Sequence, residues 1–151
     1  MRIAILAHGP SVHTINWVRS IADGRNQILV ISLAYSPECP YSSFSGVALR
    51  DLGFNVHKGS SAFHKLRYLG AILRIRKLIL EFKPNILHAH YASSYGLLGA
   101  LTGFQPLLIS VWGSDVFEFP KFSFIHSLIL RWVLYRAKMV LSTSSAMAKE
   151  T

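Results

Sequence analysis

Short apolar runs alternate along the chain with segments whose apolar residues recur at helical spacing. The apolar runs predict buried strands at residues 2–7, 27–33, 85–89, 106–111 and 138–141, with a weaker strand at 53–57. The segments with helical spacing predict helices at about 14–23, 63–83, 94–102 and 123–136. Apolar strands that alternate with helices are typical of a parallel sheet covered on both faces. The pattern therefore predicts one doubly wound α/β domain with a mostly parallel sheet.

The loop after the first predicted strand is a candidate ligand site, because ligands of doubly wound sheets bind beyond the carboxyl ends of the strands. This loop runs from His8 to His13. Gly9 permits close approach of the backbone, and the N-terminus of the next helix favours a phosphate group. The loop lacks the Gly-x-Gly-x-x-Gly spacing of dinucleotide-binding loops. A phosphate-binding loop and a tight turn with helix caps are both open interpretations.

Two histidines and one aspartate mark the ends of the fourth and fifth predicted strands. His88 and His90 alternate along a strand, which puts both imidazoles on one side of it. His88 lies deeper and is expected to be structural, whereas His90 is the candidate for a substrate contact or a proton relay. No third or fourth ligand has suitable spacing nearby, so no metal site is predicted. Asp115, the first charged residue after 84–114, is expected either to cap the next turn or to point into the ligand site.

Composition excludes several classes of protein. The chain has 151 residues, of which 51% are hydrophobic and 15% charged, and this balance fits one globular domain and rules out intrinsic disorder. Its single cysteine, Cys39, cannot form an internal disulfide and suits a reducing compartment. The uncharged stretch 84–114 is not predicted to span a membrane, because Gly103 and Pro106 interrupt it and a spanning helix needs about 20 apolar residues.

The formal net charge of +9 at pH 7 favours anionic partners. The excess lies on two predicted helical segments, since 63–83 has six basic residues and one acidic residue, and 121–138 has four basic residues and no acidic one. Basic residues beside phenylalanines, as at 117–124, suit an anionic membrane surface; a solvated basic face with the rings in the core is the alternative. The residues expected to meet a membrane surface are Arg67, Arg74, Lys77, Lys121 and Arg131.

Four segments occur in an order that is typical of one enzyme family. They are RIAILAHGPSVHTINWVRSIA at 2–22, KPNILHAHYASSYG at 83–96, PLLISVWGSDV at 106–116 and AKMVLSTSSAM at 137–147. Together they resemble the N-terminal domain of family 4 glycosyltransferases of the GT-B fold, and the resemblance covers nearly the whole chain. It implies a Rossmann-like domain that holds the acceptor. Most of the nucleotide-sugar donor would be held by a C-terminal domain that is absent from this chain.

The resemblance also implies a reaction and a set of site residues. The reaction is transfer of a sugar from a nucleotide-sugar with retention of configuration, without a metal or other cofactor. Many members have a histidine in place of Trp112 and a second glycine in place of Pro10, so the chain departs from the family at two positions. The residues expected to act in catalysis, near the acceptor and the transferred sugar, are His90 and Asp115. Those expected to bind substrate are Gly9, Pro10, Ser11 and His13, near the donor phosphates, and Tyr91, Ser93, Trp112, Gly113 and Ser114.

Residues 1–151 are therefore interpreted as the acceptor-side domain of a retaining glycosyltransferase that acts on an envelope glycan or a lipid-linked acceptor. Its expected location is the cytoplasm, including the inner face of the plasma membrane, and the domain alone is expected to be inactive. The alternatives are a nucleotide-sugar epimerase domain of the same fold and a non-catalytic domain that binds anionic membranes. Nucleic acid is not expected as a partner, because no recognition motif for it is present. No oligomeric state is predicted.

Overall fold

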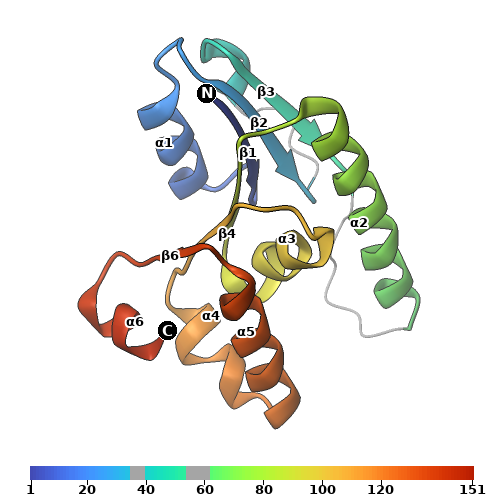
Figure 1. Ribbon diagram of the computed structural model, residues 1–151, viewed down its shortest axis with the longest axis vertical. Helices are drawn as coiled ribbons and strands as arrows, with labels where there is room; N and C mark the ends of the chain where they lie inside the picture. Colours follow the sequence, from blue (N-terminus) through green and yellow to red (C-terminus); the bar gives the residue numbers. More distant parts are fainter. Residues whose placement is uncertain (35–39, 54–61) are drawn as a thin grey trace. The chain divides into compact units, whose positions relative to one another are not determined.

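The computed structural model describes residues 1–34, 40–53 and 62–151, with the backbone alone over 62–69 (Figure 1). Within these residues the chain divides into two units, Met1–Asn85 and Ile86–Thr151. Each unit contains three strands that pair in parallel, together with the helices that connect them.

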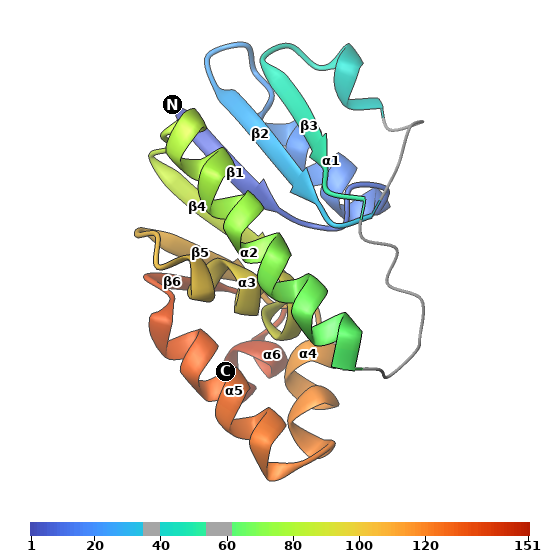
Figure 2. The same ribbon diagram turned by 90° about the vertical axis from the view of Figure 1, so that its right-hand side faces the viewer.

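The first unit is built on a parallel sheet. Its elements are β1 (Arg2–Leu6), α1 (Val12–Ile21), β2 (Gln27–Ser32), the 3₁₀ helix η1 (Pro40–Ser43), β3 (Val47–Asp51) and α2 (Ala62–Phe82). The strands lie in the order β3-β2-β1, with Ile5 opposite Val30 and Val30 opposite Leu49. Helices α1 and α2 lie on opposite faces of these strands, as the two views show (Figures 1 and 2).

Burial on both faces explains why β1 and β2 are apolar along almost their whole length. Ile5 and Val30 are fully buried, and Val18 from α1 packs into the same core cluster. A polar side chain at such a position would lose its hydrogen bonds to water, which costs about 1–3 kcal/mol when no partner replaces them.

The second unit is also built on a parallel sheet. Its elements are β4 (Ile86–His90), the π-helical turn η2 (Ala92–Gly96), α3 (Leu97–Thr102), β5 (Leu107–Ser110), α4 (Ser114–Phe117), the 3₁₀ helix η3 (Phe119–Lys121), α5 (Phe124–Arg136), β6 (Met139–Leu141) and α6 (Ser145–Glu150). The strands lie in the order β4-β5-β6, with Ser110 opposite both His90 and Leu141. Helices α3 and α5 lie on one side of these strands and α6 on the other (Figures 1 and 2).

Local sequence sets where the helices of the second unit begin and end. Ser123 and Ser144 precede α5 and α6 in extended conformation, and each hydroxyl accepts from a backbone N–H three residues later, at 3.4 and 3.2 Å. Gly103 ends α3 in the left-handed conformation, with φ of 76°, which glycine adopts without a steric penalty. These helices therefore begin and end where the sequence offers a cap.

Most predicted elements are confirmed, with their ends displaced by at most two residues. The third strand of the described residues is Val47–Asp51, which was not predicted. The weak strand predicted at 53–57 falls on residues of which 54–57 lie outside the described part of the chain. Strand β3 alternates between half-buried and exposed positions, so its sequence VALRD contains no continuous apolar run that would identify it. The helix predicted at 94–102 begins earlier, as the π-helical turn at Ala92.

Candidate functional site

The predicted site residues of the second unit gather at the carboxyl ends of β4 and β5. His90 ends β4 and Ser110 ends β5, and the two residues lie opposite each other in the sheet. The backbone N–H of Tyr91 donates to the carbonyl oxygen of Ser110 at 2.9 Å, which continues the pairing by one residue. The loops at 91–93 and 112–114 therefore leave neighbouring strands at the same end of the sheet.

The carboxylate of Asp115 joins these two loops. It is fully buried, and its Oδ1 accepts from the backbone N–H groups of Trp112 and Gly113, both at 2.9 Å. Its Oδ2 accepts from the N–H of Ala92 at 2.8 Å. The capping role predicted for Asp115 is wrong, because Gly113 is the N-cap of α4 and Asp115 is the second residue of that helix. Its carboxylate instead accepts from backbone N–H groups that precede it in the chain. A role in catalysis stays a prediction, and it would act through the positions of the loops.

Two residues next to this carboxylate have an unusual backbone conformation. Gly113 has φ of 112°, a region that side chains strongly disfavour, and Tyr91 has φ of 78° despite its bulky ring. The hydroxyl groups of Tyr91 and Ser114 are hydrogen-bonded to each other. Strained residues cost about 1–3 kcal/mol each and occur often at ligand sites, as π-helical turns such as 92–96 also do. The conformation therefore marks the loops after β4 and β5 as the candidate site.

His88 and His90 lie on the same side of β4, as predicted, with their ring centroids 4.6 Å apart. His88 is 2% exposed, and its Nε2 lies 2.8 Å from the hydroxyl oxygen of Ser110, which is the buried structural arrangement expected for it. His90 is 4% exposed, and its ring centroid lies 5.6 Å from that of Trp112. Burial lowers the pKa of His88 to about 4, and burial together with His88 lowers the pKa of His90 to about 3. Both imidazoles are therefore neutral at pH 7.

Where the structure describes the chain, the two histidines do not form part of a larger group of metal ligands. Among the described residues, no three His, Cys, Asp or Glu side chains come close enough together to hold a metal ion. The pair His88 and His90 would supply two of the four ligands that a structural zinc site requires.

The loop predicted near the donor phosphates lies in the first unit and is held by residues from other elements. The N–H of Gly9 donates to the hydroxyl oxygen of Ser32 at 3.1 Å, and the hydroxyl of Tyr41 donates to the Gly9 carbonyl oxygen at 2.6 Å. A Cβ atom at position 9 would lie 3.3 Å from the side chain of Ser32, so glycine suits this close approach. The N–H of Ser11 donates to the carbonyl oxygen of His8, which makes the loop a tight turn. Pro10 and His13 are exposed, and phosphate binding here stays a prediction.

Sequence reasoning missed three residues that support these loops. Ser32 and Ser110 each end a strand, and the available signal for both was a single polar residue that interrupts an apolar run near its end. Tyr41 is 1% exposed and lies between the predicted strands at 27–33 and 53–57, where no element was predicted. No local pattern around Tyr41 reveals a bond to a residue 32 positions away.

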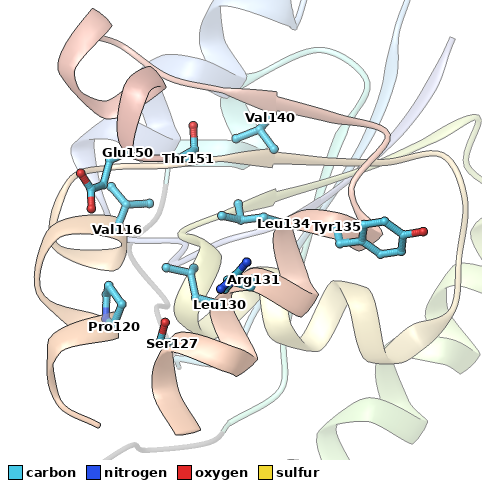
Figure 3. Close-up of a pocket in the computed structure, with 10 residues that line it drawn as sticks. All are labelled: Val116, Pro120, Ser127, Leu130, Arg131, Leu134, Tyr135, Val140, Glu150 and Thr151. Carbon is cyan, nitrogen blue, oxygen red and sulfur yellow. The ribbon is translucent and has the colours of Figure 1, made fainter. Parts of the chain in front are cut away.

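A cavity of about 500 Å³ lies between α4, η3, α5, β6 and α6 (Figure 3). Its lining combines apolar and polar side chains in similar proportion, and Arg131 and Glu150 contribute charged groups. None of the residues predicted to bind substrate lines this cavity, so the strand-end loops remain the candidate site.

The residues predicted to meet a membrane fall on three helices, α2 in the first unit and η3 and α5 in the second. Arg74 and Lys77 are exposed on α2, where Lys77 pairs with Glu81 at 3.9 Å, whereas the side chain of Arg67 lies outside the described residues. Lys121 and Arg131 are exposed at η3 and α5. Across residues 1–34, 40–53 and 62–151, none of the helices combines the length and the apolar composition required to cross a bilayer.

Parallel strands with helices on both sides and polar loops at the strand ends define a Rossmann-like α/β protein. The chain belongs to the glycosyl transferase 4-like family, whose family model matches residues 2–144. The family resemblance inferred from the sequence is therefore confirmed. No curated protein sequence was significantly similar to the chain.

Several solved structures share the fold of the chain. UDP-N-acetylglucosamine 2-epimerase from Rickettsia bellii superposes with a TM-score of 0.65 at 12% identity, over 99% of this chain and 40% of that protein. MurG from Acinetobacter baumannii gives a TM-score of 0.60 at 14% identity, over 93% of this chain and 40% of that protein. UGT73P12 from Glycyrrhiza uralensis gives a TM-score of 0.57 at 12% identity, over 99% of this chain and 46% of that protein. The doubly wound, Rossmann-like fold is thus confirmed, and the chain spans less than half the length of these proteins.

Asp115→Asn is expected to destabilise the chain by about 2 kcal/mol, because an amide presents an NH₂ group to one of the three buried backbone donors. The measurement is the free energy of unfolding in urea at pH 7. Glu118→Gln is the matched control, since Glu118 is exposed and its loss of charge should cost less than about 0.5 kcal/mol. Equal stability of both variants would contradict the proposed role of the carboxylate.

The stability of the chain is expected to fall as the pH is lowered from 6.5 towards 4. The pKa values of His88 and His90 are lower in the folded state than the usual 6.5, so the unfolded state binds protons first and is favoured at acid pH. Each histidine should contribute a loss of about 1–2 kcal/mol between pH 7 and pH 5. Urea unfolding at both pH values measures this loss.

Replacing one of the two histidines tests the origin of this pH dependence. The His90→Gln variant should lose about half as much stability over the same interval as the unmodified chain. His8→Gln, at an exposed position, should leave the loss unchanged. A His90→Gln variant with the full loss would exclude His90 as a contributor.

Proposed function

We propose that this chain is the acceptor-side half of a retaining glycosyltransferase, which transfers a sugar from a nucleotide-sugar to an envelope glycan or a lipid-linked acceptor in the cytoplasm. The family match over residues 2–144 carries the proposal. The chain spans 40–46% of the compared proteins, which supports the assignment to one half of a two-domain enzyme. The nucleotide-sugar is a substrate in this proposal, and no cofactor is required.

The loops after β4 and β5 offer groups that suit a carbohydrate acceptor. Tyr91, Ser93 and Ser114 are half-buried and carry hydroxyl groups, which can donate and accept hydrogen bonds as sugar hydroxyls do. Trp112 adds a half-buried aromatic ring with an apolar face and a polar N–H. We infer that the acceptor binds against these four residues.

His90 and Asp115 have different roles in the proposed reaction. Retaining transfer builds positive charge on the sugar ring and negative charge on the leaving phosphate. A neutral His90 can accept a hydrogen bond from the acceptor hydroxyl and orient it, once the ring of Trp112 moves to admit the acceptor. The donor phosphate then takes the hydroxyl proton. Asp115 is a positioning residue, because its carboxylate fixes the backbone of Trp112 and Gly113.

The loop at residues 8–13, in the first unit, has a proposed role that differs from those of His90 and Asp115. The N-terminal turn of α1 follows Gly9, Pro10 and Ser11, and the backbone N–H groups at a helix N-terminus favour an anion. This arrangement supports binding of the donor phosphates by the first unit.

In a two-domain protein that contains this chain, His90→Ala is expected to lower turnover at least tenfold while the fold is retained. A correctly placed hydrogen-bonding group at a reacting centre contributes about 3 kcal/mol when it is tested by deletion. Initial rates with a radiolabelled nucleotide-sugar and circular dichroism measure the two properties. Lys149→Ala, at an exposed position of α6 outside the proposed site, serves as the control. Near-normal turnover of a folded His90→Ala variant would remove His90 from the mechanism.

The chain by itself is expected to transfer no sugar, because one half of a two-domain enzyme supplies one wall of its site. The assay incubates residues 1–151 with UDP- and GDP-sugars and a polyprenyl phosphate-linked acceptor, and chromatography follows the products. Robust transfer would overturn the assignment to one half of an enzyme. Release of a sugar inverted at C2 would favour the epimerase alternative, since the Rickettsia bellii protein of the same fold is a 2-epimerase.

A further inference from the structure

The outward face of α5 carries large apolar side chains that are exposed. These side chains, here called the α5 stripe, are Phe124, Ile125, Leu128, Trp132 and Tyr135. Their exposed fractions range from 42% for Trp132 to 88% for Tyr135. Residues three, four and seven positions apart lie on the same side of a helix, so the five side chains form one continuous strip.

Core packing does not explain the α5 stripe. Leu130 and Val133 are the buried residues of this helix, and they lie on its opposite side. A surface helix normally carries polar residues opposite its buried face, and α5 carries apolar ones on both. A contiguous exposed strip of aromatic and aliphatic residues is typical of an interaction surface.

The charges around the α5 stripe indicate which partner it fits. Arg131 and Arg136 lie at the two edges of the strip by helical position, and both are exposed. Lys121 and Lys138 lie just before and after the helix, and no Asp or Glu occurs from 119 to 149. Aromatic side chains flanked by arginine and lysine suit the headgroup region of an anionic bilayer, where each basic residue adds to binding.

We propose that the α5 stripe and its flanking basic residues form a docking surface for an anionic lipid bilayer. The aromatic rings enter the headgroup region, and Arg131 and Arg136 contact lipid phosphates. This inference goes beyond the proposed transfer reaction and does not depend on it. A second copy of the chain is a poorer occupant, because a symmetric contact on this face would bring the same cationic edges together.

Helix α5 fits this role better than α2 does. Leu73 and Leu80 are exposed on α2, and within residues 70–82, the part of that helix whose side chains are described, the aromatic residue that accompanies them is Phe82 near its end. Lys77 is already paired with Glu81, which reduces the positive charge that a membrane would meet. The sequence predicted both helices as membrane-facing, and the exposed apolar strip singles out α5.

Vesicle sedimentation tests the proposal. Residues 1–151 are mixed with vesicles of phosphatidylcholine alone or with about 30% phosphatidylglycerol. Binding is expected with the anionic vesicles only, and it should weaken when NaCl is raised from 0.1 to 0.5 M. The double variant Arg131→Glu, Arg136→Glu should lower the partition coefficient for anionic vesicles at least tenfold. The double variant Leu128→Ser, Trp132→Ser should abolish binding and keep the circular dichroism spectrum of the folded chain.

A matched pair of substitutions on α2 separates local docking from general charge. Arg74→Glu with Lys77→Glu changes the net charge by the same amount and should lower binding by less than threefold. Equal losses from the α2 and α5 pairs would overturn the proposal, because they would show dependence on net charge alone. Equal binding to neutral and anionic vesicles would overturn it too. So would a dimer in sedimentation equilibrium that Trp132→Ser dissociates, because a second copy would then cover the stripe.

Discussion

The loops at the ends of β4 and β5 depend on one buried carboxylate, that of Asp115. A carboxylate removed from water is stable only when hydrogen bonds replace its hydration, and here three backbone N–H groups do so. Two of these donors follow β5, and the third, Ala92, follows β4. The charge therefore cannot stay buried unless both loops keep their positions. Charge-assisted hydrogen bonds are stronger than neutral ones, which helps to offset the strained backbone of Tyr91 and Gly113. A stable scaffold of this kind suits a site that must hold a ligand in one orientation.

Serine residues at the strand ends have a related role in both units. Ser32 ends β2 and accepts from Gly9 in the first loop, and Ser110 ends β5 and bonds to His88 in the neighbouring strand. Each hydroxyl provides a hydrogen-bond partner for a polar group that is buried among apolar strands. Each therefore contributes to stability by avoiding the cost of a buried polar group that lacks this bond. Polar loops on a rigid parallel sheet are the arrangement through which one fold serves different reactions. Function must therefore be argued from the loops and not from the sheet.

The exposed face of helix α5 is the second feature of this unit that bears on its function. Helix α5 presents apolar residues both to the interior and to solvent, and basic residues border the exposed side. The short helix η3 connects α4, which contains Asp115, to the beginning of α5. The proposed acceptor loops and the proposed docking surface thus belong to one continuous stretch of a single unit. For a lipid-linked acceptor, this connection would place the site and the source of the acceptor on the same structural unit.

The sequence by itself determined the class of fold and the ends of most helices, because buried parallel strands must be apolar along their length and helix caps are local. It also located His90, Trp112 and Asp115 at strand ends. It could not find β3, since an edge strand with alternating burial has no apolar run. The support of Gly9 by Ser32 and Tyr41 was equally hidden, because those bonds join residues 23 and 32 positions apart. Likewise, α5 carries large apolar residues on two opposite faces, so its sequence could not tell which of them face the core. The tertiary structure decided these points, because contacts between distant segments determine which polar group is satisfied and which apolar face is covered.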